Sequence, residues 1–122
     1  MRVSVDTIVE TMLAAAREQA ARQWPAAREL ASEELRKLAS TLAYVKTLLD
    51  AGKINAVRAR ALLRMQENTA RDVLRTIEGI GVLTARRTID AAMRAAATLI
   101  DLKDPRRKVH GPAATFKAGK DL

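Results

Sequence analysis

The sequence predicts an all-α protein built as a long antiparallel helical hairpin. Apolar residues recur at three- and four-residue spacing along most of the chain, which is the period of one helix face. Only three residues are aromatic, so the core must be built from Ala, Leu, Ile, Val and Met. One strong turn signal, Gly52, lies near the middle of the pattern. We therefore expect two helices of about 45–50 residues in a body over residues 1–102.

The first helix is expected over residues 5–51. Ser4 and Asp6 are suitable N-caps for it. Its middle holds Trp24-Pro25, and a proline inside a helix removes one hydrogen bond and clashes with the preceding turn. We therefore expect a bend near Pro25. Beyond it the helix carries a heptad seam for packing against the second helix: Ala31, Leu35, Leu38, Leu42, Val45 and Leu49.

The turn is expected at residues 51–54 and the second helix at residues 55–102. Gly52 suits a left-handed C-cap and Asn55 suits an N-cap. After Asp104-Pro105 no helical period continues, and residues 103–122 hold two prolines and six basic side chains. This stretch predicts an extended basic C-terminal arm, whose Arg106, Arg107 and Lys108 would tie onto a neighbouring subunit.

Two glycines interrupt the second helical pattern in the stretch TIEGIGVLTARR, residues 76–87. Over residues 77–89 this stretch resembles the helix-hairpin-helix motif of non-specific DNA-binding proteins, through the matching residues Ile77, Gly79, Ile80, Gly81, Ala85 and Ile89. The resemblance implies that Gly79 and Gly81 form a turn that offers backbone N–H groups to a phosphate, flanked by Arg86 and Arg87. Glu78 departs from the motif, because it stands where that family usually has proline.

The interpretation that we favour from sequence alone is structural. Pro25 lies 27 residues before Gly52, and Gly79 lies 27 residues after it, so in a hairpin the two bends would face each other. Gly81 would then leave room for Trp24 of the other helix. The helix-packing residues are expected to be Trp24, Leu35, Leu38, Leu42, Val45, Leu49, Gly81 and Ala85. A true helix-hairpin-helix and a compact four-helix arrangement broken at both points are the alternatives.

Composition removes several classes of function. The chain has no Cys and a single His, so thiolate zinc sites and His-pair metal sites are excluded, and we expect neither a metal nor a cofactor. No catalytic constellation is visible, and the paired acids Glu33 and Glu34 are interpreted as a solvated helix face. No segment is apolar enough for a membrane span. The net charge of +8 lies in the second half of the body and in the arm, which favours an acidic partner or nucleic acid.

These observations favour a non-enzymatic structural protein, such as a component of a virion or another particle, that self-associates through helical faces. Its partners would be copies of itself or other subunits, in the cytoplasm or in a particle assembled there. The alternative is a non-specific DNA-binding protein that uses residues 77–89. A lipid-binding helical hairpin is the least favoured hypothesis, because the body lacks aromatic anchors.

Overall fold

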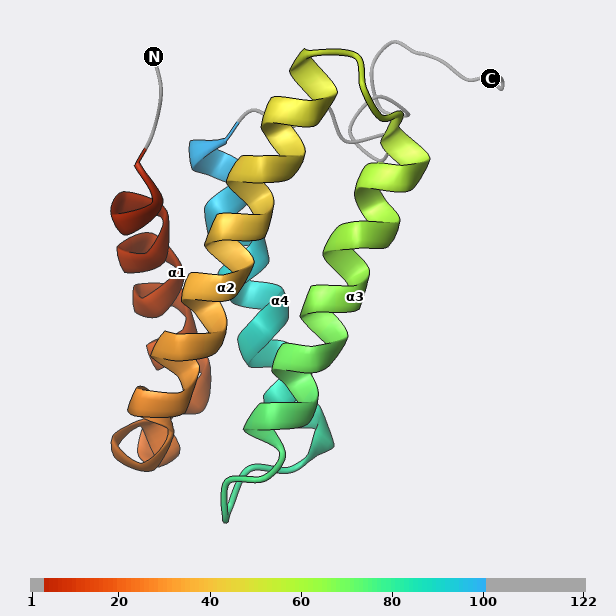
Figure 1. The fold of residues 1–122 in the computed structure, drawn as a ribbon. Coiled ribbons are helices and arrows are strands. Elements are labelled where there is room, and N and C mark those ends of the chain that lie inside the picture. The colour runs from red at the N-terminus through yellow and green to blue at the C-terminus, as the bar shows by residue number, and fades with distance from the viewer. Residues whose placement is uncertain (1–3, 101–122) are drawn as a thin grey trace, which may run out of the picture.

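The described part of the protein, residues 4–100 of a computed structural model, is an all-α bundle. Its helices are α1 (Val5–Ala20), α2 (Trp24–Asp50), α3 (Ala56–Leu74) and α4 (Val82–Leu99), with a short 3₁₀ turn, η1 (Ala21–Gln23), between α1 and α2. No strand occurs within residues 4–100. Each helix runs antiparallel to the next, and α1 and α4 also lie side by side (Figure 1). The predicted all-α class is confirmed.

The predicted pair of long helices needs correction. A helical hairpin does turn at Gly52, but each predicted arm is two helices rather than one bent helix. The expected helix over residues 5–51 is α1 and α2, and the expected helix over residues 55–102 is α3 and α4. The body is therefore the compact four-helix arrangement, broken at both of the points where the sequence predicted bends.

The first break follows from Pro25. Proline clashes with the carbonyl of the residue four positions earlier, which here is Ala21. Ala21 leaves the helical conformation, with φ 48° and ψ −115°. The chain then passes through η1, and Pro25 falls in the first turn of α2, where a missing N–H costs nothing. Because the break reverses the chain, α1 folds back along α2.

The turn between α2 and α3 is built from local sequence signals. Gly52 has a left-handed φ of 72°. Its N–H donates to the carbonyl of Leu49, and the N–H of Lys53 donates to the carbonyl of Leu48, which together make a Schellman motif. Asn55 then caps α3, because its side chain accepts a hydrogen bond of 2.8 Å from the N–H of Arg58. Both expected caps are present.

The core lies between all four helices, and α3 contributes Ala70 and Leu74 to it. The largest contact is that between α1 and α4, whereas α3 contacts α4 least among the neighbouring pairs. The α2 seam is buried from Ala31 to Val45, while Leu49 and Trp24 are half-buried. Small residues dominate on α1 and α4, and the most deeply buried side chains of the bundle include Met12, Ala16, Leu35, Leu38, Leu42, Leu74, Ala85, Ile89, Ala92 and Ala96.

Candidate functional site

The break between α3 and α4 is a tight turn over residues 75–81. The N–H of Ile77 donates to the carbonyl of Leu74, and the N–H of Ile80 donates to the carbonyl of Ile77, each at 3.1 Å. Gly79 has a φ of +91°, which side-chain-bearing residues rarely adopt. Ile80 points into the core and anchors the turn. The glycine at position 79 is thus required by the backbone.

Helix α4 starts from Gly81 without a side-chain cap. Gly81 has extended geometry, φ −85° and ψ 179°, and its carbonyl accepts from the N–H of Ala85. By contrast, side-chain oxygens of Ser4 and Asn55 cap α1 and α3. The first N–H groups of any helix have no partner within that helix. At the start of α4 no side-chain cap hydrogen bond to them is formed within residues 4–100.

The surroundings of Gly81 differ from the expected close packing. Nothing lies within 4 Å of a Cβ placed on Gly81, so no second helix approaches it and Trp24 does not fill its space. The reason is the break itself, because Gly81 is an N-cap at the end of the bundle and not a residue inside a helix. It is Gly79 that faces the first break, with the Cγ of Gln23 3.5 Å from a Cβ placed there. The two breaks therefore lie next to each other.

Arginines surround the turn. Arg75, Arg86 and Arg87 are all exposed. Within residues 4–100, Arg86 and Arg87 form no ion pair, and Arg75 has only a long contact of 3.7 Å with Asp72. Glu78 is exposed within the same turn and places one negative charge beside the glycines. The structure thus gathers Gly79, Gly81, Arg86 and Arg87 at one end of the bundle, whereas Arg106, Arg107 and Lys108 lie outside the described residues.

Two further features of this end matter for its chemistry. Val82 and Leu83, the first two residues of α4, are each more than half exposed, although both are large and apolar. Ala85 and Ile89, further along the same helix, are fully buried and fix its position. The start of α4 is therefore a firmly anchored helix end that presents open backbone N–H groups, arginines and two apolar side chains.

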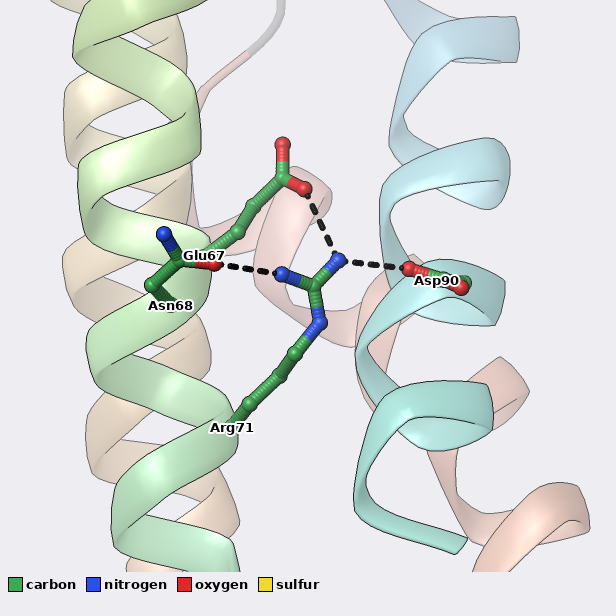
Figure 2. A network of polar contacts seen from close by, with 4 residues as sticks. All are labelled: Glu67, Asn68, Arg71 and Asp90. Carbon is green, nitrogen blue, oxygen red and sulfur yellow. Dashed lines mark hydrogen bonds and ion pairs between the residues drawn. The ribbon is translucent and has the colours of Figure 1, made fainter. Parts of the chain in front are cut away.

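A polar cluster joins α3 to α4 just behind the turn (Figure 2). Arg71 donates from Nη2 to Oδ1 of Asp90 at 2.8 Å and to Oε1 of Glu67 at 3.3 Å, and from Nη1 to Oδ1 of Asn68 at 2.8 Å. The Nε of Arg71 is buried without a partner within residues 4–100. The spacing of Glu67 and Arg71 signals a pair on one helix, but no sequence signal indicates Asp90.

The pair Glu33 and Glu34 also departs from expectation. Glu33 is exposed, but Glu34 is only 3% exposed. The Oε2 of Glu34 accepts from Nζ of Lys37 at 3.1 Å, and its Oε1 has no partner in the described part of the chain. A buried carboxylate with one open oxygen is costly, yet within residues 4–100 no group of three or more potential metal-ligating side chains surrounds it or any other site.

Comparisons with known proteins leave the site to be interpreted from its geometry. None of the helices in residues 4–100 is both long enough and apolar enough to cross a membrane. No family model, curated protein or solved structure matches this chain.

Proposed function

We propose that the protein binds nucleic acid without sequence specificity, through the turn at residues 75–81 and the start of α4. The observation that carries the proposal is the N-terminus of α4, which begins at a glycine and has no side-chain cap among the described residues. A helix N-terminus attracts anions, because its N–H groups point outward and the helix dipole is positive there. A backbone phosphate of DNA or RNA is the acceptor that such an end suits.

The distribution of charge supports the same proposal. Residues 56–99 hold eight arginines and four carboxylates, whereas residues 4–50 hold six basic and seven acidic side chains. The positive excess of the bundle therefore lies on α3, the turn and α4. Because arginine stays charged and can bind phosphate with two parallel hydrogen bonds, this half of the bundle suits a phosphate backbone.

The proposed contact is with the phosphate backbone alone. The N–H groups at the start of α4 would donate to phosphate oxygens, and Arg86 and Arg87, one turn further along the helix, would neutralise flanking phosphates. The proposed donors are backbone N–H groups and arginine side chains, and both would contact phosphates rather than base edges. Sequence-independent binding with a steep dependence on salt is the behaviour that follows.

The first test is a fluorescence-anisotropy titration of a labelled mixed-sequence duplex at several NaCl concentrations, with wild-type protein and Gly81→Asp. An aspartate fits the N-cap geometry of Gly81 and has open space, so the variant should be as stable as wild type or more stable. Its carboxylate would occupy the N–H groups and repel phosphate. We expect an affinity loss of about 10- to 100-fold, because hydrogen bonds to charged groups contribute about 1.5–3 kcal/mol.

The arginines supply a matched control. Arg86→Ala and Arg87→Ala should each reduce the slope of log K against log[salt] by about 1. Arg94→Ala, an equally exposed arginine further along α4, should leave both slope and affinity nearly unchanged. If the wild-type protein does not bind the duplex at low salt, or if Gly81→Asp binds as well as wild type, the proposal is wrong.

As a second candidate we propose a structural role in which the protein self-associates. One observation favours it: the two most exposed large apolar side chains of the bundle, Val57 and Met65, lie on the same helix, α3. Apolar side chains gathered on one surface are typical of an interface between proteins. The C-terminal arm that was expected to tie subunits together lies outside the described residues and adds nothing to this argument.

A further inference from the structure

We infer that copies of this protein associate head to tail, with the outer face of α3 in one copy docked on the outer face of α2 in the next. The inference rests on the structural role proposed above and names the two surfaces that would meet. The α3 face is defined by Val57, Ala61, Leu62 and Met65. The α2 face is defined by Leu30, Glu33 and Tyr44.

The α3 face is apolar and exposed. Val57, Ala61 and Met65 recur at four-residue spacing, so they lie in one row along the helix. Val57 is 76% exposed and Met65 is 67% exposed, and Leu62 borders the row. Within the described part of the chain no other element covers these side chains. The row therefore presents one continuous apolar strip in the N-terminal half of α3.

Arginines border the α3 face. Arg58, Arg60 and Arg64 are exposed, and none forms an ion pair with any of residues 4–100. An occupant of this strip must therefore combine exposed apolar side chains with unpaired carboxylates. The chain's own residues 103–122 do not have this character, because they hold six basic and two acidic side chains.

The α2 face has the character that the α3 face requires. Leu30, Glu33 and Tyr44 share one side of the helix, since they are separated by three and eleven residues, close to whole turns at 3.6 residues each. Leu30 and Tyr44 are among the exposed large apolar residues. Glu29 and Glu33 are exposed and form no ion pair within residues 4–100. A second copy therefore supplies both the apolar and the acidic groups.

The geometry also decides the form of the assembly. The two faces are different surfaces on neighbouring helices, so a copy that uses its α3 face still offers its α2 face to a third copy. Such heterologous contacts form rings or open chains rather than simple dimers. The α3 face lies at the end of α3 that is near residue 56, whereas the glycine turn lies at the opposite end (Figure 1). The α3 face is thus distant from the turn, whereas Leu30 and Glu33 of the α2 face lie in the half of α2 that is nearer to it.

The test is sedimentation velocity at low salt over a range of protein concentrations, with the full chain and two charge reversals. Arg64→Glu places an acid on the α3 face, and Glu33→Arg places a base on the α2 face. Each variant alone should associate at least about tenfold more weakly than wild type, because like charges would meet at the contact. An equimolar mixture of the two variants should recover association, since every contact in an alternating chain then pairs opposite charges.

Two further variants distinguish an effect of the α3 and α2 faces from a general effect of changed charge or lost folding. Arg94→Glu makes the same change of charge on α4, away from both faces, and should associate like wild type. Met65→Ser should weaken association by removing apolar area from an exposed position, without disturbing the core. Circular dichroism should show that each variant keeps the helical content of wild type.

The outcomes are distinct. If wild type remains monomeric at every concentration and salt, both the structural role and this inference are wrong. If wild type associates but the charge variants and Met65→Ser behave like it, the structural role stands and the docking of α3 on α2 is wrong. If both charge reversals weaken association but their mixture does not recover it, the two faces do not contact each other and the inference is likewise overturned.

Discussion

At the scale of single residues, Gly79 and Gly81 are two positions apart and differ in why a glycine is tolerated or required there. Gly79 holds a positive φ of 91°, while Gly81 is extended and surrounded by open space. Gly79→Ala should destabilise the fold by about 1–3 kcal/mol, because the cost arises from backbone strain. Gly81→Ala should stay within about 0.5 kcal/mol of wild type. Urea unfolding monitored by circular dichroism measures both.

The pair of variants also separates strain from crowding. A Cβ on Gly79 would meet Cγ of Gln23 at 3.5 Å, which is an ordinary contact, so Gln23→Ala should not rescue Gly79→Ala. Rescue by Gln23→Ala would show that side-chain crowding, and not the positive φ, requires the glycine. An equal loss of stability in Gly79→Ala and Gly81→Ala would contradict the assignment of Gly81 as an open N-cap.

At this scale the sequence is most informative where the cause is local. Gly52, Asn55 and Pro25 act through their own backbone or through neighbours within one turn, and their roles as caps and as a break are predictable from the sequence. Gly81 is the counterexample. Whether a glycine in an apolar pattern is a packing surface or a helix start depends on where the chain goes next, which is not a local property.

At the scale of helices, a polar contact links α3 to α4 across a small interface. The α3–α4 contact is the smallest between neighbours, and Arg71 bridges it to Asp90. The Arg71 and Asp90 side chains are about a quarter and a third exposed. A double-mutant cycle with Arg71→Ala and Asp90→Ala should give a coupling energy of about 1 kcal/mol.

The chain contains a matched pair for this cycle. Arg75 and Asp72 also form an ion pair, but at 3.7 Å, within one helix and more than half exposed on both sides. Their coupling energy should fall near zero to 0.5 kcal/mol, as is typical of solvated pairs spaced along a helix (about 0.3–0.5 kcal/mol). Equal coupling in both cycles, measured by urea unfolding, would mean that the Arg71–Asp90 contact does not hold α3 against α4.

Helix pairing is also where prediction from sequence stops. The seam of Leu35, Leu38 and Leu42 correctly indicates the buried face of α2. It does not indicate how many helices cover that face. A buried stripe packs equally well against one long partner helix or against two short helices that fold back. Which of the two occurs depends on whether the chain bends or reverses its direction at Ala21 and Gly79.

At the scale of the whole molecule, the folding back of α1 and α4 buries apolar positions that a long hairpin would leave exposed. Two long helices bury one stripe each, and apolar positions outside that stripe need further neighbours. In the bundle, α1 supplies those neighbours to both α2 and α4. The self-association expected from sequence would meet this need with other subunits. Much of it is met within the chain, and the strip of Val57 and Met65 on α3 is the most exposed apolar surface that is left.

The close contact between α1 and α4 depends on alanine. Ala16, Ala85, Ala92 and Ala96 have no exposed surface, and a core built on such small side chains leaves no space for longer ones. Ala92→Leu should therefore destabilise the protein by about 1–3 kcal/mol through overpacking, although leucine is a good helix former. Ala14→Leu, at an exposed position of α1, should change stability by less than about 0.5 kcal/mol.

Thermal unfolding of the two leucine variants tests whether Ala92 is packed in the core as the bundle requires. In the bundle, Ala92 is buried in the same core cluster as residues of α1. Ala92→Leu should therefore cost less stability in a Met12→Ala background, where α1 carries a smaller side chain. Met12→Ala is itself a destabilising change. In a long hairpin folded at Gly52, Ala92 and Met12 would also lie opposite each other, since each is 40 residues from the turn, so this coupling tests the contact between α1 and α4 that both arrangements share. If Ala92→Leu proves as harmless as Ala14→Leu, α4 does not fold back onto α1 and the four-helix arrangement is wrong.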